Sequence, residues 1–144
     1  MADINILEID PVTRRVTFSL NLVPTKVDGI VNLLQLCIKT VLTTTGYDSF
    51  SPLYGGSLKD YLKKGIMRND IPSVSADIIR IVNIAESHIK YEQQGTTIPD
   101  KEKLKSMKVT SIEWNDTLDS LDVYIQVTSI AGVTTDINLG NQLR

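Results

Sequence analysis

The chain has 144 residues, a formal net charge of −2 at pH 7 and a hydrophobic content of 42%. This length and composition predict one globular domain, residues 1–144, and exclude a disordered chain. The weak negative charge, and the lack of any apolar run near the roughly 20 residues of a membrane helix, argue against a nucleic-acid or membrane partner.

Two β-like runs open the chain, at residues 5–9 and 12–22. Asp10 and Pro11 between them are a turn signal. Apolar and polar residues alternate over residues 16–19 (VTFS), as they do in a strand with one buried face. We therefore expect an N-terminal β-hairpin.

A first helix should follow, opened by Pro24 and Thr25. Thr25 and Asp28 resemble a capping box, in which side chains at the helix start bind free backbone N–H groups. Apolar residues recur at helical spacing over residues 27–41, and the helix should end near residues 43–45.

Two more helices are predicted, a short one over about residues 58–64 and a long one from Pro72 to about Gln94. Ser73 or Ser75 should cap the long helix, and Gly95 should close it. The charged segment 101–107 (KEKLKSM) predicts a short amphipathic turn.

The last third of the chain reads as strands, at residues 109–114, 121–128 and 133–139. Leu121, Val123, Ile125 and Val127 alternate strictly with more polar residues, which indicates an antiparallel meander with one buried face. The predicted fold class is α+β: an N-terminal β-hairpin, three helices and a C-terminal antiparallel β-meander.

The sequence motifs of common catalytic and metal sites are missing from this chain. The one histidine, His88, lies on the long predicted helix, and the one cysteine, Cys37, lies on the apolar stripe of the first. Neither a nucleophile motif, a phosphate-binding glycine loop nor a metal-ligand spacing is present. We expect no catalytic residue, cofactor or metal ion, and we expect Trp114 to be a core or rim residue.

One longer string, residues 29–62, combines a helix with a corner rich in aromatic and turn residues: GIVNLLQLCIKTVLTTTGYDSFSPLYGGSLKDYL. It resembles the baseplate wedge family of contractile-tail phages, also known as the sheath initiator or baseplate assembly protein W. The matching residues are Leu34, Gln35, Ile38, Leu42, Thr43, Gly46, the run Ser51-Pro52-Leu53-Tyr54-Gly55-Gly56, and Leu58. The order of elements also agrees over about residues 25–139.

The resemblance implies a structural, non-enzymatic protein of a bacteriophage virion, made in the host cytoplasm and placed in the tail baseplate in about six copies. Its partners would be the tail sheath protein, other wedge proteins and the tail tube or hub. Its C-terminal sheet would start the first sheath ring during tail assembly by accepting strands of the sheath protein, a form of β-augmentation.

Two groups of residues are candidates for these binding and structural roles. Val133, Thr135, Ile137 and Leu139 form the strand that we expect at or near the sheet edge, where a partner strand would add. Phe50, Pro52, Tyr54, Gly55 and Gly56 form the corner. We expect a rigid joint there that orients the first helix against the short one and can also contact a neighbouring wedge subunit, with Phe50 and Tyr54 anchored by burial. A direct binding hot spot is the alternative.

The family carries a Glu-Pro-Arg motif after its long helix, and its Glu and Arg form a buried ion pair. This chain lacks the tripeptide and has Glu102 and Lys103 in the corresponding region. These two residues are the candidate ion-pair position, although lysine lacks the forked geometry of arginine. Two other functions stay open: a small lysozyme-like cell-wall hydrolase, and a generic peptide-binding adaptor.

Overall fold

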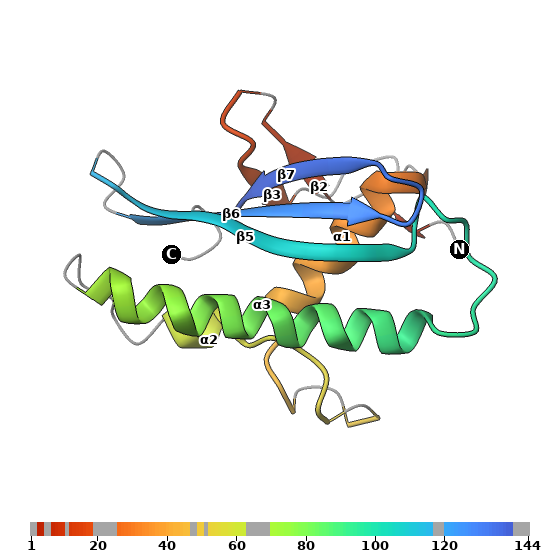
Figure 1. Cartoon of the computed structure of the whole chain (residues 1–144), viewed down its shortest axis with the longest axis horizontal. Coiled ribbons are helices and arrows are strands. Elements are labelled where there is room, and N and C mark those ends of the chain that lie inside the picture. The colour runs from red at the N-terminus through yellow and green to blue at the C-terminus, as the bar shows by residue number, and fades with distance from the viewer. Residues whose placement is uncertain are drawn as a thin grey trace.

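The computed structural model describes residues 3–4, 7–10, 12–18, 26–46, 49–50, 52–62, 70–116 and 120–139 (Figure 1). Its elements in chain order are β1 (Asp3–Ile4), β2 (Leu7–Ile9), β3 (Val16–Phe18), β4 (Lys26–Val27), α1 (Gly29–Leu42), α2 (Leu58–Leu62), α3 (Ile71–Gln93), β5 (Leu104–Asn115), β6 (Ser120–Ser129) and β7 (Thr134–Asn138).

The fold is α+β, with two long helices, α1 and α3, and a three-stranded antiparallel sheet in the order β5-β6-β7. The predicted arrangement of three helices behind an N-terminal hairpin is wrong. α2 has only 5 residues, little more than one turn. The N-terminal strands form two separate two-stranded ladders, β1 with β4 and β2 with β3. Residues 19–22 of the predicted second strand lie outside the described ranges.

The central strand β6 organises the core. Its residue Ile125 pairs with Val109 of β5 on one side and with Ile137 of β7 on the other. The four alternating apolar residues of β6 are all buried, as the sequence pattern predicted: Leu121, Val123, Ile125 and Val127. Figure 1 shows α3 running below the sheet, nearly along β5, with α1 crossing behind.

Helix α1 begins at Gly29, later than the sequence predicted, because residues 26–27 belong to β4. Thr25 lies outside the described residues, and Asp28 at the N-cap makes no side-chain cap hydrogen bond. A distant residue supplies the cap instead: Oε1 of Glu102 accepts a hydrogen bond from the Gly29 N–H at 2.8 Å. A carboxylate at this end also suits the helix dipole.

Helix α3 begins one residue before Pro72, in agreement with the tolerance for proline in the first turn. The expected serine caps are wrong: Ser73 Oγ donates to the Asp70 carbonyl at 3.0 Å, and Ser75 Oγ donates to the Ile71 carbonyl at 2.7 Å. The helix buries one apolar face against the sheet and α1: Val74, Ile78, Ile81, Val82, Ala85 and Ile89. Gly95, just beyond its end, has a φ of 70°, as a closing glycine should.

Strand β5 begins at Leu104, so the predicted amphipathic turn at residues 101–107 is wrong in its second half. Leu104 and Met107 are both buried, which is a spacing of three that resembles a helix. The structure explains this spacing by a register shift between Leu104 and Ser106, which inserts an extra residue into the strand.

Candidate functional site

Strand β7 forms one edge of the main sheet, and its backbone groups alternate in direction. The carbonyl of Val133 accepts from the Ser129 N–H at 2.9 Å, and the Leu139 N–H donates to the Val123 carbonyl at 3.0 Å. Both bonds point toward β6. The Asn138 N–H instead donates away from β6, to the Arg14 carbonyl at 2.9 Å. The backbone N–H and C=O groups of the odd-numbered residues 133–139 therefore bond to β6. The backbone groups of the even-numbered residues point outward from the sheet edge.

The four residues predicted to bind a partner strand are the odd-numbered ones, whose backbone groups bond to β6. Ile137 and Leu139 are buried in the core, and Thr135 pairs with Val127. Val133 precedes β7 and is 36% exposed. Their side chains can hold the sheet in position, but an added strand would bond to the alternate residues.

The sequence pattern did not indicate those alternate residues, Thr134, Asp136 and Asn138. The apolar alternation shows which side chains face the core. The direction of the backbone groups depends on the register with β6, where Val127 pairs with Thr135 and Thr128 pairs with Thr134. The sequence pattern carries no signal for that register.

Part of the β7 edge is already occupied by the N-terminal segment. Besides the bond from Asn138, Nε of Arg14 donates to the Asp136 carbonyl at 3.0 Å. Arg15 forms an isolated parallel bridge with Asn138. Within the described part of the chain, the outward groups left open are the N–H and C=O of Thr134 and the N–H of Asp136.

An ion pair anchors this N-terminal segment. Nη2 of Arg15 lies 3.0 Å from each carboxylate oxygen of Asp122 on β6. The two side chains are only 12% and 6% exposed. Nδ2 of Asn115 also donates to Asp122, at 3.3 Å. Removing one partner would leave a charge buried, which is costly, so the pair fixes Arg15 firmly beside β7.

The opposite edge of the sheet, β5, is modified in ways that discourage pairing. It carries register shifts at two places, between Leu104 and Ser106 and between Val109 and Ser111. Helix α3 also reaches it, where Oε2 of Glu86 accepts from the Met107 N–H at 3.1 Å. Bulges and covering groups are common protections of sheet edges. The five-residue register of β7 with β6 has no shift, so β7 is the more regular edge.

The glycines of the corner make a tight joint with the end of α1. A Cβ on Gly55 would lie 2.4 Å from the Thr43 carbonyl oxygen, and Gly55 has a φ of 113°. A Cβ on Gly56 would lie 2.9 Å from the Val41 carbonyl oxygen, and its N–H donates to the Thr40 carbonyl at 2.9 Å. These positions require glycine because the two backbone segments approach so closely.

The aromatic residues of the corner have different surroundings. The Tyr54 hydroxyl hydrogen-bonds to the Thr40 hydroxyl, and its ring lies 6.2 Å from the His88 ring, centroid to centroid. Phe50 is 95% exposed, so the expectation that burial anchors it is wrong. Pro52 and Leu53 are exposed as well. The corner is thus a joint at Tyr54–Gly56 that carries an exposed apolar tip at Phe50 and Leu53.

Glu102, one half of the predicted ion-pair position, is buried beside α1. Its two carboxylate oxygens accept from the Gly29 N–H at 2.8 Å and from Nδ2 of Asn32 at 3.2 Å. Lys103 is half-buried, and its carbonyl accepts from the Ile130 N–H at 2.9 Å. The hydrogen bonds described for the Glu102 carboxylate therefore tie the turn just before β5 to α1, and its pairing with Lys103 stays a prediction.

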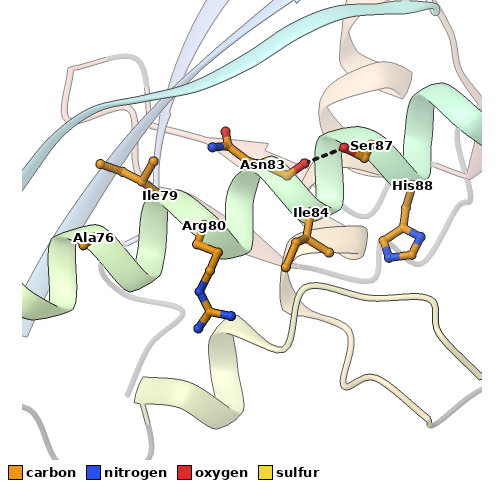
Figure 2. A pocket seen from close by; sticks show the side chains of 7 residues that line it. All are labelled: Ala76, Ile79, Arg80, Asn83, Ile84, Ser87 and His88. Atoms are coloured by element: carbon orange, nitrogen blue, oxygen red, sulfur yellow. Dashed lines mark hydrogen bonds between the residues drawn. The ribbon is translucent and has the colours of Figure 1, made fainter.

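A shallow hollow of about 410 Å³ lies along the outer side of α3. Figure 2 shows its lining: Ala76, Ile79, Arg80, Asn83, Ile84, Ser87 and His88. The Ser87 hydroxyl donates to the Asn83 carbonyl at 3.0 Å, within the helix. The polar groups in Figure 2 do not converge on one point, so the hollow has the character of a helix surface rather than of a catalytic cleft.

The remaining candidate residues serve packing. Cys37 is fully buried, and burial raises the pKa of its thiol well above the usual range. Trp114 is partly buried against the core. Among the described residues, no group of three or more His, Cys, Asp or Glu side chains is arranged to hold a metal ion. None of the described helices is long and apolar enough to span a membrane.

Comparisons with known proteins add no relative to this description. No protein-family model matches the chain, and neither a curated protein nor a solved structure shows significant similarity to it.

Proposed function

We propose that this protein is a structural component of the baseplate of a contractile phage tail, or of a related injection particle. It accepts strands of the sheath protein at its C-terminal sheet and so starts the first sheath ring. The sequence string at residues 29–62 and its PxYG-type corner support the class of particle, through the resemblance described above. The geometry of β7 supports the mode of binding.

The observation that carries the proposal is the regular outer edge of β7. Among the residues that the structure describes, none bonds to the outward N–H and C=O of Thr134 or the outward N–H of Asp136, while β5 is bulged and partly covered by Glu86. Strand addition uses main-chain hydrogen bonds for affinity and alternate side chains for register. The buried side chains of Ile137 and Leu139 hold β7 in place while its edge receives the partner.

Sheath growth on baseplates that carry an Asp136→Pro variant tests this proposal. Proline removes the outward N–H of Asp136. The side chain that it replaces is exposed, and the backbone bonds to β6 belong to the neighbouring odd-numbered residues, so these bonds are retained. We expect sheath nucleation, followed by electron microscopy, to fall at least tenfold. The matched control is Asp136→Asn, which retains the N–H and should nucleate sheath normally.

Normal sheath growth on the Asp136→Pro baseplates would contradict the proposal. A peptide-binding adaptor would use the same edge, so a second experiment separates the two functions. We expect the purified protein to capture sheath and wedge proteins from infected cells. If the purified protein instead captured one host protein from uninfected cells, and the Asp136→Pro variant did not, the adaptor function would be favoured.

A further inference from the structure

The β7 edge has an open end and a closed end. At the open end, the N–H and C=O of Thr134 and the N–H of Asp136 have no partner in the described chain. At the closed end, Arg14 holds both the Asp136 carbonyl and the Asn138 N–H, at 3.0 and 2.9 Å. A partner strand can therefore extend its pairing from Asp136 to Asn138 only if the segment that carries Arg14 is displaced from β7.

The loop that carries Arg14 is built to keep its place. Oδ1 of Asp10 accepts from the N–H groups of Val12 and Thr13, each at 2.8 Å. Backbone bonds then close the loop, from the Arg14 N–H to the Asp10 carbonyl and from the Asp10 N–H to the Arg15 carbonyl, both at 2.9 Å. This closed turn directs the Arg14 carbonyl at the sheet edge.

Arg14 adopts an unusual backbone conformation within this loop, with a φ of 58°. Residues other than glycine rarely take this left-handed conformation, because it is strained for a residue with a Cβ, so the surroundings must hold Arg14 in it. The next residue supplies that constraint, because Arg15 is held by the buried carboxylate of Asp122. Strain at the residue that contacts β7, beside a strong anchor, indicates a specific placement of the segment.

We propose that the Arg14–Arg15 segment is a register stop, which limits strand addition on β7 to the Thr134–Asp136 end. The accepted partner is then a short extended segment that pairs beside Thr134 and Asp136 and turns out of the sheet before Asn138. This inference rests on the proposed strand addition. It adds the residues that decide where the added strand must end.

Amide hydrogen exchange of the full chain tests the stop before any partner is added. In the wild type, the Asn138 amide should exchange at least tenfold more slowly than the outward amides of Thr134 and Asp136. The double variant Arg15→Met/Asp122→Asn removes the buried pair while keeping similar side-chain volumes. It should speed exchange at Asn138 at least tenfold and leave the inward amide of Leu139 slow.

Arg14→Gly is the matched control, because glycine accepts the positive φ and keeps the carbonyl that binds Asn138. The Asn138 amide should stay slow in this variant. Equal exchange at Asn138 and Thr134 in the wild type would overturn the inference, as would an Asn138 amide unaffected in the folded double variant.

Addition of purified sheath protein then separates the stop from the proposed function. If the register stop exists, sheath binding to the wild type should slow amide exchange at Thr134 and Asp136, while the Asn138 amide exchanges slowly both before and after binding. In the double variant, sheath binding should also slow exchange at Asn138. If sheath binding displaced the Arg14–Arg15 segment, so that its amides exchanged faster, the register stop would be overturned but the proposed strand addition would be retained. Sheath binding with no new protection along β7 would overturn both.

Discussion

Oε1 of Glu102 accepts a hydrogen bond from the Gly29 N–H across 73 residues of sequence. Through this bond, a buried carboxylate from the turn just before β5 caps the first turn of α1. The contact joins the helix that leads into the glycine corner to the turn that leads into the sheet. It therefore couples the two parts of the molecule that the proposed function uses.

Replacing this cap should destabilise the whole domain. We expect Glu102→Ala to lower the free energy of unfolding by about 1–3 kcal/mol, because a helix cap is lost and the partly buried N–H of Gly29 loses its partner. Urea denaturation measures the change. Glu92→Ala, at an exposed position near the end of α3, is the control and should stay within about 0.5 kcal/mol of the wild type. Equal effects of the two substitutions would contradict the capping role.

The glycine joint should be intolerant of even one methyl group. A Cβ at residue 55 would meet the Thr43 carbonyl oxygen at 2.4 Å, so Gly55→Ala should cost about 2–4 kcal/mol of stability. Gly95 also has a positive φ but has no atom within 4 Å of an added Cβ. Gly95→Ala should therefore cost only about 1 kcal/mol. Similar thermal midpoints for both variants would show that the close approach to α1 does not matter.

The exposed tip of the corner should contribute little to folding. Phe50 is 95% exposed, so Phe50→Ser should change the free energy of unfolding by no more than about 0.5 kcal/mol. If the tip contacts a neighbouring wedge protein, the same variant should still enter baseplates less efficiently. Quantifying the protein in purified particles checks this. A large loss of stability would instead mean that Phe50 is part of the joint.

The contact between α2 and α3 should make stability fall at high pH. The Tyr61 hydroxyl donates to Oδ2 of Asp77 at 2.6 Å, and this bond, aided by burial and the carboxylate charge, raises the pKa of Tyr61 to about 12. The unfolded chain, with a pKa near 10, loses this proton first. Stability from this group is therefore present below pH 10 and is lost as the pH rises toward 12.

Comparison of Tyr61→Phe with the wild type by urea denaturation across that pH range measures the effect. The wild type should lose stability more steeply between pH 10 and 12 than the variant does. The ultraviolet absorbance of tyrosinate, taken as a difference between the two proteins, should titrate near pH 12. A Tyr61 titration near pH 10 would contradict the role of Asp77.

The sequence predicts the elements whose side chains repeat with one period. The strict alternation of β6 and the helical spacing of α3 each come from one buried face, and both appear in the structure. The start of β5 could not be predicted in this way, because its bulge gives Leu104 and Met107 a helix-like spacing. The cap of α1 was missed because Glu102 is remote in sequence. Capping patterns are local, so they carry no information about it.

The candidate site also combines features that the local sequence pattern predicts with features that depend on remote contacts. The strand that forms the sheet edge was predicted, since Ile137 and Leu139 follow the apolar alternation. The outward residues Thr134 and Asp136 were missed, because backbone direction depends on pairing with β6. The contact of Arg14 with β7 links residues 122 positions apart, and nothing in the local sequence indicates it.

The burial of Cys37 makes the native protein convenient for site-specific labelling. Cys37 is the only cysteine of the chain and lies on the buried face of α1. Burial raises the pKa of its thiol, so the thiol stays protonated. Thiolate is the reactive form of cysteine, so dyes and spin labels should leave Cys37 untouched in the folded state. A cysteine introduced at exposed Thr134 would then be the single reactive thiol. A fluorophore placed there would report the arrival of a partner strand in real time, with no need to remove the natural cysteine from the core.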